Sequence, residues 1–219
     1  METARPESEV SFLFFAFLAG FAFIVLLEYL YPELFRRDTR HLFYFSGLTS
    51  QQRNVRTYAA YQALSVVLFG FTFALFFSTY LARRYFDRDF SFSLMGAVFV
   101  LALAFLLLRY LADRFLAWLF DVHSLAGAIM EKRIAFQLAF GVYGLALFFI
   151  FTYSGFSPAG FEEKVLVWFF VLYILIYVAV MAEYLVGSAE YFFYFIFYLC
   201  IVEICPVLVV WNMLKRTLA

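Results

Sequence analysis

The chain alternates between long apolar runs and short polar segments. A helix needs about 20 apolar residues to cross the roughly 30 Å hydrocarbon core of a bilayer, and six runs are of this order. They cover residues 11–31, 58–82, 92–114, 133–153, 164–186 and 190–214. This pattern predicts an all-α fold: a polytopic transmembrane helical bundle of about six helices, with residues 1–219 forming a single integral membrane domain.

The helical pattern of the third run continues beyond residue 114 to Phe120. A helix of that length, at 1.5 Å per residue, is too long for one perpendicular crossing. Either the helix tilts, or its last turns form a long amphipathic extension. Arg109 and Asp113 are four residues apart there, so they share a face and can form an ion pair.

The longest polar segment, residues 33–57, combines five arginines with the aromatic triplet 43–45. Interleaved basic and aromatic residues are typical of a segment that lies at the membrane interface. Residues 121–132 form a second polar stretch, which we interpret as a connection between helices.

Composition supports the membrane assignment. Apolar residues make up 66% of the 219 positions and charged residues 15%, whereas soluble domains are roughly half apolar and a quarter charged. The formal net charge is zero, so we expect the lipid bilayer, and no nucleic acid, as a partner. Residues 1–9 are acidic and the first run is longer than a typical signal-peptide core, so we expect a retained span.

The basic residues divide evenly between the two sides of the predicted bundle. Arg109 and Arg114 lie toward the side that holds segment 33–57. The positive-inside rule then favours a cytoplasmic 33–57 segment, with both termini outside.

Glu203 lies near the middle of the last run, with Pro206 three residues further on. An ionisable group inside a bilayer is costly unless it is paired, hydrated or neutralised. Proline removes a backbone donor and crowds a carbonyl one turn earlier. The pair therefore either forms a proton or cation site beside a kink, or holds a protonated carboxyl that hydrogen-bonds a neighbouring helix.

Further polar candidates inside or near the spans are Arg109, Asp113 and Glu183. Arg109 can pair with Glu203 or Asp113, bind an anion, or extend toward the headgroups. Glu183 fits an interfacial position. Small residues at four-residue spacing favour close helix approach, either within the chain or to a partner. These pairs are Ala16 and Gly20, Gly70 and Ala74, and Ala135 and Ala139.

The sequence lacks recognisable catalytic chemistry. Its two histidines, His41 and His123, lie in predicted connections, and no HExxH, CxxC or glycine-rich phosphate loop occurs. We therefore expect no metal site, no cofactor and no catalytic residues. An intramembrane enzyme acting on lipid through carboxylates and arginines stays open as an alternative.

The C-terminal run contains Tyr198, Leu199, Cys200, Glu203 and Pro206 in the order Tyr-Leu-Cys-x-x-Glu-x-x-Pro. This motif resembles the closing motif of an uncharacterised bacterial multi-pass inner-membrane family, the domain of unknown function 4271 type. The resemblance implies a bacterial inner-membrane protein with about six helices, and it supplies no activity or substrate.

Three functions follow as hypotheses. The first is a non-enzymatic accessory or scaffold component of a membrane complex, with partner membrane subunits or a homo-oligomer. The second is a small transporter or channel that uses Glu203 and Pro206. The third is the intramembrane lipid enzyme.

Overall fold

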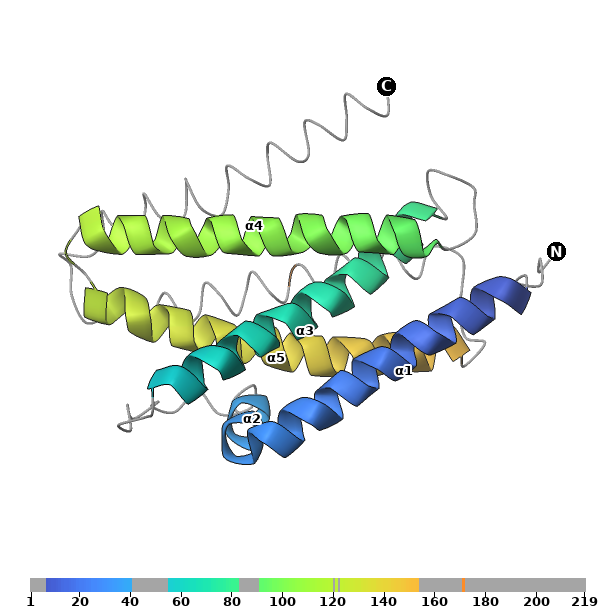
Figure 1. The fold of residues 1–219 in the computed structure, drawn as a ribbon, viewed down its shortest axis with the longest axis horizontal. Helices are drawn as coiled ribbons and strands as arrows, with labels where there is room; N and C mark the ends of the chain where they lie inside the picture. Colours follow the sequence, from blue (N-terminus) through green and yellow to red (C-terminus); the bar gives the residue numbers. More distant parts are fainter. Residues whose placement is uncertain are drawn as a thin grey trace, which may run out of the picture. The chain divides into compact units, whose positions relative to one another are not determined.

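The structure is a computed structural model that describes residues 7–40, 55–82, 91–119, 121, 123–153 and 171. The elements found there are helices, and none is a strand (Figure 1). Their bounds are α1 Glu7–Leu30, α2 Pro32–Arg40, α3 Val55–Leu81, α4 Phe92–Leu119 and α5 His123–Tyr153.

Four of these helices are long and apolar enough to cross a membrane. The candidate spans are Phe12–Leu30, Tyr58–Leu81, Phe92–Leu119 and Ile129–Tyr153. They correspond to the first four apolar runs of the sequence. The last two predicted spans, 164–186 and 190–214, lie outside the described residues except for position 171, so the count of about six stays a prediction.

Helix α5 begins earlier than the sequence predicts. The polar sequence of segment 121–132 predicts a connection, but α5 already begins at His123. Within it, Leu125, Met130 and two alanines are good helix formers. A helix can continue from a bilayer into water, because its backbone hydrogen bonds are internal. The polar residues of segment 121–132 therefore do not interrupt α5.

The chain forms two compact units. Unit 1 consists of residues 1–104 and 133–170, and unit 2 of residues 105–132 and 171–219. Unit 1 therefore holds α1, α2 and α3 with the first part of α4 and most of α5, and unit 2 holds the rest of α4 and the start of α5. The prediction of a single membrane domain stays a prediction.

Helix α3 buries a seam with a seven-residue repeat. Buried residues follow each other at alternating spacings of four and three: Tyr61, Ser65, Leu68, Thr72, Leu75 and Thr79. This is the spacing by which a helix keeps one stripe against its neighbours. One position of the repeat is large, and the other carries a small hydroxyl residue, which lets adjacent helices approach closely.

Each end of this seam packs into its own cluster within unit 1. Near the start of α1, the core contains Phe17 with Leu75 of α3 and Phe148 of α5. The ring centroids of Phe17 and Phe148 lie 5.3 Å apart. Near the end of α1, a second core contains Leu27 of α1 with Tyr61 of α3, together with residues of α2 and α5.

Helices α3 and α5 approach closely at Gly141. A Cβ atom at this position would lie 3.3 Å from the Cγ of Leu68 and 3.3 Å from the backbone nitrogen of Phe69. The Oγ1 of Thr72 donates a hydrogen bond of 3.1 Å to the Gly141 carbonyl oxygen. The small pairs noted in the sequence are likewise buried: Ala16 and Gly20, Gly70 and Ala74, and Ala135 and Ala139.

In unit 2, Asp121 makes the turn between α4 and α5. Its φ of 53° lies in the left-handed region, which Asp adopts more readily than most non-glycine residues. Its backbone N–H donates to the Trp118 carbonyl oxygen at 3.4 Å. Asp121 thus satisfies one of the carbonyls left open at the end of α4.

Candidate functional site

The chain bends sharply between α1 and α2 (Figure 1). The N–H of Tyr31 still donates to the Leu27 carbonyl oxygen at 3.0 Å, and its own carbonyl accepts from Phe35 at 2.9 Å. Tyr31 therefore ends one helix and begins the next. Pro32 lacks the N–H that would continue α1, and its fixed φ suits the first position of α2.

Helix α2 is amphipathic over only nine residues. Phe35 and Asp38 are three positions apart on its buried side, whereas Glu33 and Arg36 are exposed. Phe35 belongs to the core near the end of α1. Asp38 extends the same face, so a carboxylate occupies a position where the pattern calls for an apolar side chain.

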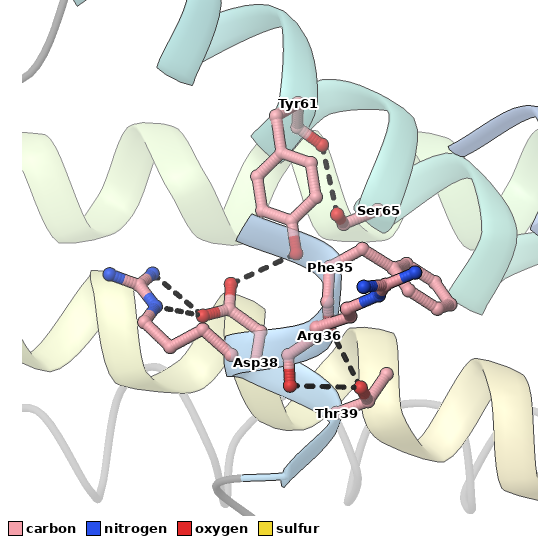
Figure 2. Close-up of polar contacts among 7 residues, drawn as sticks. Phe35, Arg36, Asp38, Thr39, Tyr61 and Ser65 are labelled. Atoms are coloured by element: carbon pink, nitrogen blue, oxygen red, sulfur yellow. Dashed lines mark hydrogen bonds and ion pairs between the residues drawn. The ribbon is translucent and has the colours of Figure 1, made fainter. Parts of the chain in front are cut away.

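The buried Asp38 carboxylate is held by two donors. The side chain of Asp38 is 3% exposed. The phenolic O–H of Tyr61 on α3 donates to its Oδ2 at 3.0 Å, as Figure 2 shows. The Nε of Arg37 donates to the other oxygen, Oδ1, at 2.6 Å. Two charge-assisted hydrogen bonds thus offset the cost of removing this carboxylate from water.

Tyr61 is itself fixed on several sides. It is fully buried, and the Ser65 hydroxyl donates to its backbone carbonyl at 2.8 Å (Figure 2). The ring of Tyr31 meets the Tyr61 ring edge-to-face, with centroids 5.5 Å apart. The centroid of the Tyr58 ring lies 6.4 Å from that of Tyr61. A phenol with these neighbours has one orientation, which aims its hydroxyl at Asp38.

This arrangement is suited to fastening helices. Both Asp38 oxygens accept hydrogen bonds from within the chain, and the donors come from α2 and α3. A carboxylate that serves as a general base must reach a substrate proton, and Tyr61 and Arg37 occupy the approach to this one. Among the described residues, no three His, Cys, Asp or Glu side chains gather where they could hold a metal ion.

The predicted site residues separate into two groups. Arg109 and Asp113 lie on α4, within unit 2, and each is only 6% exposed. On the same stretch of helix Leu108, Leu111 and Phe115 are exposed. The extension of the third span is thus helical, with its polar pair on the buried side. Glu183, Glu203 and Pro206 lie outside the described residues.

Sequence reasoning missed Asp38 and Tyr61. The interleaved arginines and aromatic residues of segment 33–57 indicate an interfacial position and do not single out Asp38. The available signal was positional, because Leu34, Phe35 and Asp38 recur at helical spacing directly after a helix-starting proline.

Comparison with known proteins places the chain only at family level. A family model described as a domain of unknown function, DUF4271, matches residues 13–214. No curated protein and no solved structure matches.

Proposed function

The chain belongs to the DUF4271 family, and from that premise we propose that it is a non-enzymatic accessory or scaffold subunit of a membrane complex. We further propose that this membrane is the bacterial inner membrane, and that the chain crosses it several times. Four apolar helices of spanning length are consistent with the assignment.

The observation that carries the proposal is the use made of buried polar groups in unit 1. The Asp38 carboxylate binds Tyr61 of the neighbouring helix, and Thr72 binds the carbonyl of Gly141. Both contacts join separate helices, 23 and 69 residues apart along the chain. A protein that holds transmembrane helices in fixed positions needs such contacts, whereas a substrate path needs polar groups that stay accessible.

A second support is the number of large apolar side chains that are exposed on α1 and α4. Such surface can face lipid or a partner helix. The most exposed of these side chains are Phe15, Val25, Tyr29, Val100, Leu101, Leu107, Leu108 and Trp118.

The proposal is tested by photo-crosslinking in native membranes. A photoreactive amino acid is placed at Leu18 on α1 or at Leu108 on α4, both exposed, in a tagged full-length chain. A subunit of a complex gives a discrete protein adduct at one position at least, and the same protein copurifies in fixed stoichiometry in mild detergent. Lipid adducts alone, with a monomeric purified chain, would contradict the proposal.

A further inference from the structure

Helix α2 contacts all three other helices that meet at its end of unit 1. Besides its bond to Tyr61 of α3, it is linked to α1 by an ion pair of 3.4 Å between Arg36 and Glu28. Its contact with α5 is a hydrogen bond of 3.4 Å, in which the Tyr143 hydroxyl donates to the Thr39 carbonyl oxygen.

These contacts differ in strength. The Arg36–Glu28 pair is exposed to solvent, where such pairs contribute little, and the Tyr143 bond is long and exposed. The Asp38–Tyr61 bond is buried and shorter, and one partner is charged, so its loss leaves a buried donor without an acceptor. Of these three links it is therefore the strongest.

Helix α2 is too short to be stable alone. Isolated helices below about 12–15 residues are marginal in water, and α2 has nine. Its position depends on Phe35 in the core with Leu27 and Leu138 and on the Asp38–Tyr61 bond. The core at the other end of α1 contains Phe17, Leu75 and Phe148 and no residue of α2.

We propose that α2 is a clasp, closed by the Asp38–Tyr61 hydrogen bond, that holds the ends of α1, α3 and α5 together on one side of unit 1. When this bond is broken, that end opens and the opposite end stays packed. The clasp does not depend on the partner proposed above, because all of its contacts lie within the chain.

The first test is hydrogen exchange of the full chain in nanodiscs, with Tyr61→Phe as the variant. This change keeps the ring in place and removes only the donor. The amides of residues 35–39 are expected to exchange on the order of tenfold faster, the size expected for losing a hydrogen bond to a charged group. Amides around Leu75 should be unchanged. Tyr29→Phe, in which an exposed ring loses the same hydroxyl, is the matched control and should match the parent.

The second test measures distances between spin labels. One pair, at Leu30 of α1 and Ala60 of α3, reports on the clasp end; the other, at Phe15 of α1 and Ile150 of α5, reports on the far end. All four positions are exposed. In Tyr61→Phe, the distance distribution of the first pair should widen and that of the second should stay as in the parent.

Two outcomes would overturn the clasp. Unchanged exchange in α2 together with an unchanged first pair would mean that the bond does not hold this end closed. Equal loosening at both ends would mean a general loss of packing. Asp38→Asn gives a second reading if Tyr61→Phe folds poorly, because the neutral amide oxygen accepts a weaker hydrogen bond from Tyr61. Exchange of residues 35–39 should then rise above that of the parent, while the amides around Leu75 stay unchanged.

Discussion

Thr72 donates a hydrogen bond of 3.1 Å to the carbonyl oxygen of Gly141, joining α3 to α5 at a close approach of the two backbones. Gly141 has no side chain, so the backbones of α3 and α5 can approach closely there. The Thr72 hydroxyl is then near enough to bind the Gly141 carbonyl. Stability of the crossing should therefore depend on both residues in different ways.

Gly141→Ala should destabilise the protein. The added methyl group would meet the backbone nitrogen of Phe69 at 3.3 Å and its Cα at 3.4 Å, and backbone atoms cannot move aside as a side-chain end can. We expect a loss of about 1–3 kcal/mol in the free energy of unfolding, as for overpacked cores. Thermal unfolding in detergent measures it.

Gly96→Ala is the matched control, because a Cβ at Gly96 of α4 meets nothing within 4 Å. There the higher helix propensity of alanine should leave stability equal or raise it by up to about 1 kcal/mol. Equal effects at the two glycines would refute the close approach at Gly141.

Thr72→Val should cost less. Valine keeps the branched shape and removes only the hydroxyl that bonds Gly141. Interhelical hydrogen bonds in membranes contribute about 0.6 kcal/mol on average, so we expect a loss of that order, with Thr72→Ser retaining the bond. If valine proves as stable as threonine, the bond contributes nothing.

Asp38→Ala should be the most harmful change among the polar residues of α2. It leaves the buried Tyr61 hydroxyl without its acceptor and removes the partner of Arg37. The expected loss is about 1–3 kcal/mol. Glu33→Ala, on the exposed face of the same helix, should stay within about 0.5 kcal/mol of the parent. Denaturant unfolding of both variants measures the two losses in free energy. Similar losses would show that the Asp38–Tyr61 bond does not stabilise α2.

The turn at Asp121 offers a test within unit 2. Its positive φ of 53° is unfavourable for a β-branched side chain. Asp121→Val should therefore lower stability by about 1–2 kcal/mol, and Asp121→Gly should relieve backbone strain. Thermal unfolding that ranks valine above glycine would contradict the left-handed turn.

Glu203→Gln separates the proposed function from transport. A scaffold subunit should show no flux of protons or monovalent cations in proteoliposomes, with or without Glu203. A flux in the parent that falls in Glu203→Gln would instead favour a transporter that uses Glu203 and Pro206.

The sequence was sufficient to predict the all-helical class, the family and four candidate membrane spans. Helices and closed barrels both satisfy the backbone in lipid, and continuous apolar runs of about 20 residues fit helices, so helices over residues 12–30 and 58–81 follow from the length of these runs. Helix α2 was not predicted as a helix, because nine residues with three arginines look like a surface segment. Helical spacing places Asp38 on the face of Leu34 and Phe35, and only the tertiary structure shows that it binds Tyr61.

For Arg109 and Asp113 of α4, the sequence predicts the helix but not the burial of the two side chains. The spacing of Arg109 and Asp113 predicts that they share one face of a helix, and α4 does continue through both. Periodicity cannot say whether a polar face looks outward, because that depends on what packs against it. Both side chains prove to be buried.

The seven-residue repeat of α3 also limits how the gene can change length. Adding or deleting one residue between Leu68 and Thr72 would rotate the rest of the helix by about 100°. Thr79 would then turn away from its neighbours, and the two halves of the stripe would no longer align. An insertion of seven residues would restore the alignment while lengthening the helix by about 10 Å. Relatives that differ in the length of this helix should therefore differ by sevens.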